Sequence, residues 1–214
     1  MSTIKLTGYI WLLATLLVGA GEFFLHYSPN VLNIEGSLDF LAAVPVENFK
    51  IGHLLVLLGI PLYFVGYYHF YLMLKSGWEK ISKLFYVIAV IAFGCGAIWI
   101  ASRGFIGQII HMKDLISPDV FTAIEKHYLF YYESLLQVLR VLIFVVSGLW
   151  AYLIYTGKTN YPKYMMLFSP IILLFLVASS ALLPSIGKFL VPIALNPAHF
   201  ILFAWSLYHL NKLK

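Results

Sequence analysis

The chain has 214 residues, of which 62% are hydrophobic and only 11% carry a charge. Soluble domains usually have about 25% charged residues, so this composition excludes an ordinary water-soluble globule. The formal net charge of +5 comes without a basic stripe interleaved with aromatic residues, which excludes a nucleic-acid interface. The single cysteine, Cys95, excludes disulfides and thiolate zinc sites.

Six apolar runs are long enough to cross a membrane, for which a helix needs about 20 residues to span roughly 30 Å of hydrocarbon. In chain order they are residues 6–27, 49–74, 84–102, 129–155, 164–183 and 191–210. The connections between them are too short for an independent core. We therefore expect an all-α, polytopic membrane protein, in which residues 1–214 form a single bundle of six transmembrane helices.

Two local patterns describe these helices further. In the second run, Gly52, Gly59 and Gly66 recur every seven residues, which favours close approach of another helix along one face. Before the fourth run, Ser117 is a good N-cap and Pro118 suits the first helical position, so this helix should begin in water and run into the membrane.

Lysine and arginine residues accumulate at one set of helix ends. This set holds Lys5, Lys75, Lys80, Lys83, Lys158, Lys163, Lys212 and Lys214 against the single acid Glu79. The other set holds Lys50, Arg103, Lys113, Lys126 and Lys188 against Glu35, Asp39, Glu47, Asp114, Asp119 and Glu125. Because positively charged loops stay in the cytoplasm, we predict that both termini are cytoplasmic and that the protein is a multi-pass protein of the cell membrane.

Polar side chains within the predicted spans concentrate near the outer ends. Glu22 and His26 are four residues apart and share a face of the first helix, as do Asn196 and His199, three apart, in the last. A charge near a helix centre costs about 2.5 to 3.5 kcal/mol on insertion scales, so each such group needs a partner, a water-filled cavity or a function. The pattern predicts a polar chamber open to the outer side.

The fourth helix adds a polar stripe, because Glu133, Gln137 and Arg140 follow an i, i+4, i+7 pattern. In one interpretation, Arg140 forms a structural salt bridge with Glu133 or Glu22. In the other, Arg140 orients or balances an acid that performs chemistry or binds a cation. The sequence leaves both open.

Clustered histidine and glutamate side chains commonly act as metal ligands, although a single buried histidine often only forms hydrogen bonds. The expected metal ligands are His26, His53 and His199. The expected catalytic residues are Glu22, Glu133 and Arg140, and the expected cofactor-binding residues are Asn196, Gln137 and Arg103. By contrast, the positions of His69 and His209 near the cytoplasmic ends are explained by the membrane interface.

Three segments carry a resemblance in layout to bacterial six-span membrane-protein families of unassigned function: "LTGYIWLLATLLVGAGEFFLHY", "ASRGFIGQIIH" and "LNPAHFILFAWSLY". The cluster of His and Glu at one membrane face also resembles the membrane-embedded zinc amidohydrolases of the alkaline ceramidase kind. The chain departs from these enzymes in having six spans instead of seven, no HxxxH pair in the last helix, and Glu22 where an Asp is wanted. The resemblance implies a zinc ion that lowers the pKa of a bound water to about 7, with a second carboxylate as base.

The residues therefore suggest a metal-dependent hydrolase that acts on a lipid, with zinc or another divalent metal in an outer-leaflet chamber. The alternatives are a transporter or binding protein for a small molecule or ion, which would use the Glu133–Gln137–Arg140 stripe, and a non-enzymatic membrane subunit. A single haem is a weaker expectation, and two haems are disfavoured because His53 and His69 lie about 160° apart around their helix at 100° per residue. The expected partners are membrane lipids, with no nucleic acid.

Overall fold

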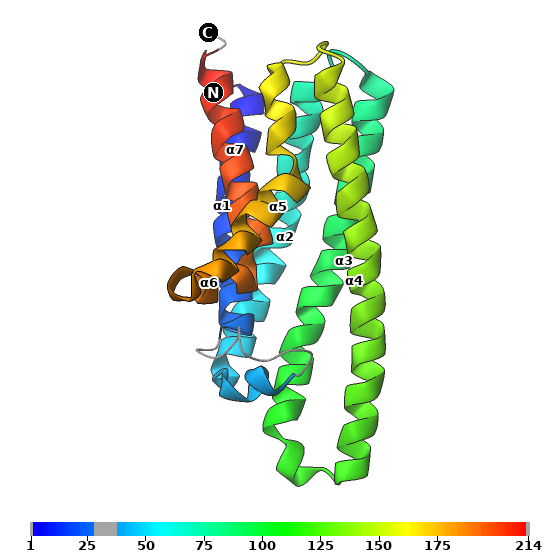
Figure 1. Cartoon of the computed structure of the whole chain (residues 1–214), viewed down its shortest axis with the longest axis vertical. Helices are drawn as coiled ribbons and strands as arrows, with labels where there is room; N and C mark the ends of the chain where they lie inside the picture. Colours follow the sequence, from blue (N-terminus) through cyan, green and yellow to red (C-terminus); the bar gives the residue numbers. More distant parts are fainter. Residues whose placement is uncertain (1, 28–37, 213–214) are drawn as a thin grey trace.

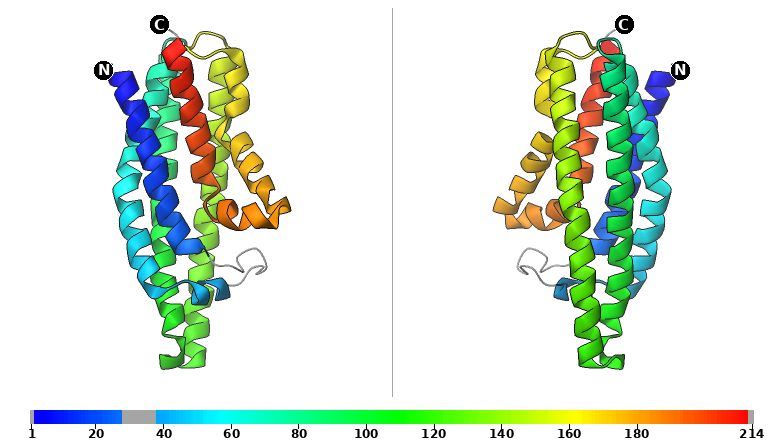
Figure 2. Two further views of the ribbon diagram at one scale, coloured as in Figure 1. Left: turned by 90° about the vertical axis from the view of Figure 1, so that its left-hand side faces the viewer. Right: turned by 90° about the vertical axis from the view of Figure 1, so that its right-hand side faces the viewer.

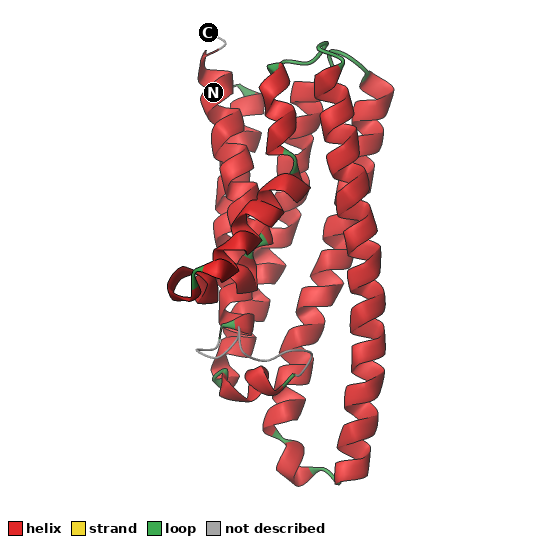
Figure 3. Cartoon of the chain, in the orientation of Figure 1, coloured by secondary structure: helices red, strands yellow, loops and turns green. Residues whose placement is uncertain are grey.

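The computed structural model of the chain describes residues 2–27 and 38–212, and within this part every regular element is helical (Figure 3). The α-helices are α1 (Thr3–His26), α2 (Val46–Leu74), α3 (Glu79–His111), α4 (Pro118–Tyr155), α5 (Pro170–Ala178), α6 (Pro184–Leu190) and α7 (Leu195–Lys212). Short 3-10 turns join them: η1 (Asp39–Ala43), η2 (Lys113–Leu115), η3 (Lys163–Phe168), η4 (Ser179–Leu182) and η5 (Val191–Ile193).

Four helices, α1 to α4, are long and apolar enough to cross a membrane, or up to five if α6, η5 and α7 are counted as one bent span. The first four predicted runs are therefore confirmed as helices. The first ends one residue beyond α1, and the other three lie within longer helices. The fifth predicted run, residues 164–183, is not one continuous helix: Pro170 starts a new helix after η3, and α5 with η4 forms a shorter apolar helix, Pro170–Leu182. The axis then turns by 83° between the α6–η5 segment and α7.

The long helices run up and down beside one another, and the start of α1 and the end of α7 lie at the same end of the bundle, here called the terminal end (Figure 1). At the opposite, distal end, α3 and α4 extend beyond the other helices (Figures 1 and 2). With 38 residues, α4 is about 57 Å long, far more than the roughly 30 Å of a bilayer core. As the sequence predicts, α4 begins at Pro118, directly after Ser117, although the Ser117 side chain makes no cap hydrogen bond.

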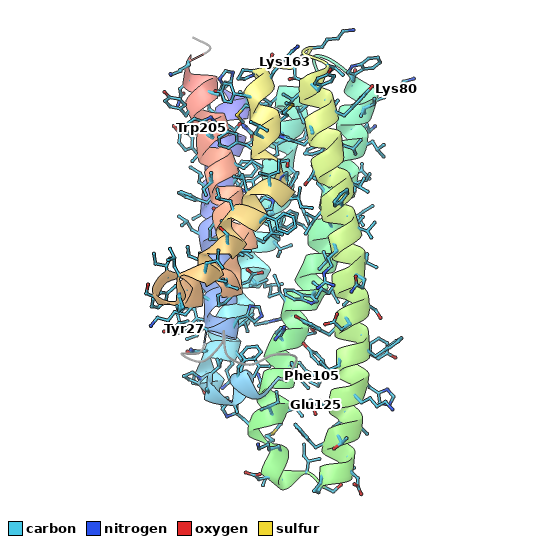
Figure 4. All side chains as sticks on the ribbon, in the orientation of Figure 1. Tyr27, Lys80, Phe105, Glu125, Lys163 and Trp205 are labelled. Atoms are coloured by element: carbon cyan, nitrogen blue, oxygen red, sulfur yellow. The ribbon has the colours of Figure 1, made fainter. Side chains whose placement is uncertain are left out.

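The terminal end carries the lysines on which the predicted orientation rests. Figure 4 places Lys80 and Lys163 there and Glu125 toward the distal end. Lys5 Nζ donates to Asn211 Oδ1 over 2.5 Å, which ties the start of α1 to the end of α7. Two other charged residues in that prediction, Glu35 and Lys214, lie outside the described residues.

The closest helix contact joins α1 and α2 along the predicted glycine stripe. A Cβ atom at Gly52 would lie 2.7 Å from the carbonyl oxygen of Gly21, and one at Gly66 would overlap the indole ring of Trp11. Gly59 faces Val18 in the same way. All three glycines thus serve the packing role that the sequence predicts, because no larger side chain fits between the two backbones.

Trp11 is the centre of the core, with none of its surface exposed. Its ring stacks on Phe203 of α7 with centroids 3.4 Å apart and meets the edge of Tyr63 of α2 at 5.2 Å. Phe70 lies 5.4 Å away, also on α2. One indole therefore joins α1, α2 and α7, the three helices that carry most of the buried polar groups.

We expect Gly66→Ala to destabilise the bundle, because the added methyl group meets the Trp11 ring and overpacking of this kind typically costs about 1 to 3 kcal/mol. The matched control is Gly94→Ala on α3, where a Cβ atom meets nothing within 4 Å. Thermal unfolding in detergent would measure both. Equal unfolding midpoints for the two variants would show that the α1–α2 contact is looser than described.

Candidate functional site

A cavity of about 290 Å³ lies inside the bundle between α1, α2, α3, α4, α5 and α7. Most of its lining is apolar, and the polar residues on its wall are Glu22, Tyr67, Arg140, Asn196 and His199, with the ring of Trp99. Small-molecule sites have this character, with a mostly apolar wall and a few polar groups. The cavity is therefore the candidate site.

Glu22 and Asn196 form the polar centre of the cavity wall. Asn196 Nδ2 donates to Glu22 Oε2 over 2.5 Å, and the hydroxyl of Tyr63 donates to Asn196 Oδ1 over 2.6 Å. Glu22 is 5% exposed and Asn196 4%. No described residue bonds to Glu22 Oε1, so one carboxyl oxygen stays available to the cavity.

His199 sits one helical turn beyond Asn196 on α7 and is fully engaged. Its Nδ1–H donates to the carbonyl oxygen of Leu195 over 2.7 Å, which leaves Nε2 to accept from the hydroxyl of Tyr67 over 2.8 Å. The ring packs at the edge of Phe93, with centroids 5.4 Å apart. His199 is therefore held in a single orientation on the cavity wall.

Arg103, a predicted cofactor-binding residue, does not line the cavity; it stands one helical turn beyond the lining residue Trp99 on α3. The guanidinium donates to the hydroxyl of Tyr132 and lies over the rings of Tyr132, Trp99 and Phe40, at 4.3, 5.5 and 5.5 Å from their centroids. Arg103 is 9% exposed, and its Nε and Nη1 atoms have no hydrogen-bond partner among the described residues. Aromatic faces rather than an acid thus surround this cation.

His26 lies on α1 close to this aromatic cage, with its ring centroid 6.0 Å from that of Trp99. Its Nδ1–H donates to the carbonyl oxygen of Pro192 over 3.3 Å, and its buried Nε2 has no described partner. Arg103 forms no ion pair with Glu22, whose Oε2 accepts from Asn196. The interpretation in which Arg140 forms a salt bridge with Glu22 is also not what the described residues form, because Asn196 is the partner of the Glu22 carboxyl.

The predicted metal ligands do not come together. His53 is exposed on α2, whereas His26 and His199 are buried, and His199 uses both nitrogens within the protein. No group of three or more His, Cys, Asp or Glu residues in the described part is placed to hold a metal ion. The donor set on the cavity wall therefore does not fit the zinc ion that the sequence suggested.

The predicted stripe on α4 divides. Glu133 and Gln137 are exposed, do not line the cavity, and have no hydrogen bond or ion pair with a described residue. Arg140 lines the cavity while remaining exposed. The interpretation in which Arg140 forms a salt bridge with Glu133 is therefore not what the described residues form. Glu133 follows Tyr132, whose hydroxyl meets Arg103, by one residue, about 100° around the helix, and its side chain is exposed.

A second polar cluster lies toward the terminal end, where His69 is completely buried rather than interfacial. Its Nδ1–H donates to the carbonyl oxygen of Ile4 over 2.8 Å, and its Nε2 accepts from Ser206 Oγ over 2.8 Å. Ser206 also bonds to the hydroxyl of Tyr161 at 2.5 Å. A serine beside an oriented histidine is the geometry of a nucleophile and its base. However, Ser206 has no exposed surface and lines neither described cavity. The hydrogen bonds of this cluster therefore serve to hold the helices together.

Sequence reasoning missed Tyr63, Tyr67, Trp99 and Tyr132, which supply or border most of the polar contacts. Tyr63 had a usable signal, since it stands four residues after Gly59 and three before Gly66 and so shares the glycine face of α2. Trp99 had no such signal, because aromatic residues are frequent throughout these helices. The tyrosine hydroxyls were therefore partly predictable and the aromatic cage was not.

We expect Asn196→Leu to destabilise the protein by about 1 to 3 kcal/mol, because it leaves the buried Glu22 carboxyl and the Tyr63 hydroxyl without their partner. The double variant Glu22→Leu with Asn196→Leu should recover part of the loss, because it removes the unpaired carboxyl. Unfolding midpoints of the two single variants and the double variant complete the cycle. Additive effects would mean that the two side chains do not interact.

The family model described as "Family of unknown function (DUF6796)" matches residues 1–212. No curated protein and no solved structure matches the chain. The match covers almost the whole chain, including every helix that contributes to the cavity. The chain therefore belongs to this family of unknown function.

Proposed function

We propose that this protein is a multi-pass membrane protein that takes an amphiphilic molecule from the bilayer into the cavity between its helices. One observation carries the proposal: a cavity of about 290 Å³ that is apolar on most of its wall and polar at a few convergent side chains. Such a wall suits a ligand with an apolar chain and one polar end.

The position of the opening supports entry from the side. Arg140 is exposed, and Leu136, Ile143 and Leu174 are partly exposed, although all four line the cavity. These residues belong to α4 and α5, so the cavity opens along the flank of the bundle, where acyl chains would lie in a membrane. Ligands that are dissolved in the bilayer would reach such an opening without passing through water.

The broken region from α5 to α7 supports the same proposal. Pro170, Val191, Pro192, Ala194 and Leu195 all line the cavity and stand at or near helix ends. Inside a bilayer, non-helical backbone is tolerated where it is buried in protein or lines a cavity. The helix breaks thus coincide with the site, as they do in transporters whose binding sites are built from interrupted helices.

Metal-dependent hydrolysis of a lipid stays a prediction, but the cavity supports it less. The zinc chemistry needs three protein ligands and an open position, and the expected ligand His53 is exposed away from the cavity. Binding of an amphiphile needs only a mostly apolar cavity wall with a few polar side chains, and the cavity has such a wall.

Blocking the cavity tests the proposal. A Cβ atom at Gly96 would meet only Leu139 Cδ2, at 3.9 Å, and Gly96 lines the cavity, so Gly96→Phe places a ring inside it. We expect Gly96→Phe to abolish binding of a radiolabelled single-chain amphiphile such as dodecanoate to the purified protein. The matched control, Gly94→Phe, adds the same ring on the same helix outside the cavity and should bind normally. Equal binding by both variants would disprove a ligand site in this cavity.

We further propose six crossings with cytoplasmic termini, the fifth crossing being the broken segment η3–α5–η4. The lysines at the terminal end support this orientation. In a Cys95→Ser background, Lys188→Cys on α6 should react from outside with a membrane-impermeant maleimide, and Lys158→Cys at the terminal end should react only after the membrane is opened. The reverse pattern would invert the orientation, and labelling of both residues from one side would reduce the number of crossings.

A further inference from the structure

We propose that the ligand of the cavity carries an oxyanion, a carboxylate or a phosphate ester, and that Arg140 binds it at the opening. This inference rests on the proposed function and names the chemical class of the ligand. It follows from which polar groups on the cavity wall already have partners and which do not.

Arg140 is the polar side chain on the cavity wall whose donors are free. It lines the cavity, is exposed, and has no hydrogen bond, ion pair or aromatic contact with any described residue. The one ion pair within residues 2–27 and 38–212 joins Lys50 to Glu47, far along the chain from α4. Glu22, the acid in the same cavity, accepts from Asn196 instead.

The other polar side chains that could donate at the wall already take part in hydrogen bonds, and Glu22 Oε1, the oxygen that stays available to the cavity, is a carboxyl oxygen without a donor beside it. Asn196 donates to Glu22 and accepts from Tyr63, while His199 uses one nitrogen for Leu195 and the other for Tyr67. The indole N–H of Trp99 has no partner among the described residues, but its nitrogen is buried. A ligand that forms hydrogen bonds at the opening therefore meets the guanidinium of Arg140 first.

The depth of Arg140 makes an unpaired charge costly. It stands eight residues beyond Tyr132 and 15 before Tyr155 on α4, which places it about 12 Å from the first and about 22 Å from the second along the helix axis. In the proposed topology this is well inside the apolar layer, where arginine side chains face a cavity or a partner and commonly mark a substrate path. An anion at this position would compensate the charge.

The chemistry of the side chain selects the class of anion. A guanidinium presents its donors as a planar fork that matches the two oxygens of a carboxylate or phosphate, and it stays charged at every physiological pH. The cavity volume, about 290 Å³, lies at the lower end of small-molecule sites, which span roughly 300 to 1,000 Å³. The site thus fits one apolar chain with an oxyanion at its end better than a whole two-chain phospholipid.

The experiment compares three probes that share a twelve-carbon chain: dodecanoate, dodecyl phosphate and dodecanol. Radiolabelled dodecanoate binds to the purified full-length protein in maltoside micelles, and the other two compete, with scintillation proximity as the readout. Dodecyl phosphate should compete as well as unlabelled dodecanoate. Dodecanol should compete about 10-fold less well or worse, since a hydrogen bond to a charged group is worth a factor of this size.

Arg140→Gln should weaken dodecanoate binding by about 10-fold or more and leave dodecanol binding unchanged, so that the preference for the anion disappears. Arg140→Lys keeps the charge without the fork and should retain part of the preference. Inorganic phosphate and acetate, used as competitors, test whether an anion without an apolar chain also binds. Strong competition by either of them would show that the site takes the oxyanion alone and would overturn the need for an apolar chain.

The outcomes separate this inference from the proposed function. If Arg140→Gln keeps the full preference for dodecanoate while Gly96→Phe abolishes binding, the cavity binds an amphiphile but Arg140 does not recognise its charge. If Gly96→Phe has no effect, the proposed function itself fails. If Arg140→Gln leaves binding unchanged but separates an oligomer into monomers in size-exclusion chromatography with light scattering, a second copy of the chain compensates Arg140 and the inference is wrong.

Discussion

The contact between Trp11 and Gly66 is the constraint on which the rest of the bundle depends. It lets the backbones of α1 and α2 approach closely, and it fixes which face of α1 turns toward α2 and α7. Glu22 follows Trp11 by 11 residues, about 20° from the same direction around the helix at 100° per residue. The packing of the indole thus also directs the carboxyl of Glu22 toward Asn196.

Hydrogen bonding within this interior is distributed over long sequence separations. Glu22 on α1 bonds to Asn196 on α7, and Tyr63 on α2 bonds to the same amide. In an apolar environment an unpaired polar group is costly, so these contacts hold the three helices at one relative height. These contacts therefore fix the part of the cavity wall that α1, α2 and α7 form, whereas Leu136 of α4 and Leu174 of α5, which also line the cavity, stay partly exposed.

The sequence predicts the fold well where a pattern has a physical period. Gly52, Gly59 and Gly66 mark a packing face because their spacing returns to one side of the helix. Glu22 and Asn196 are predicted to share one chamber because both lie near the outer ends of their predicted spans, and the structure brings them into contact.

The predictions fail where the position of a residue along its helix was considered without the side of the helix on which it lies. His53 has the right depth for the chamber, but it follows Gly52 by one residue, about 100° around the helix, and so faces outward. Likewise, the apolar run from residue 164 to 183 is long enough for a span, but Pro170 divides it. Hydropathy averages over that proline, whereas the missing N–H and the fixed ring geometry act at one position.

The order of the elements along the chain has a consequence for how the protein is made. The tight α1–α2 pair is complete once residues 1–74 have left the ribosome, and N-terminal elements generally form first during synthesis. Until α7 arrives, however, Glu22 lacks Asn196 and His69 lacks Ser206. A chain that stalls or loses α7 therefore leaves Glu22 Oε2 and His69 Nε2 without these partners, a defect by which quality-control proteases would recognise incomplete copies.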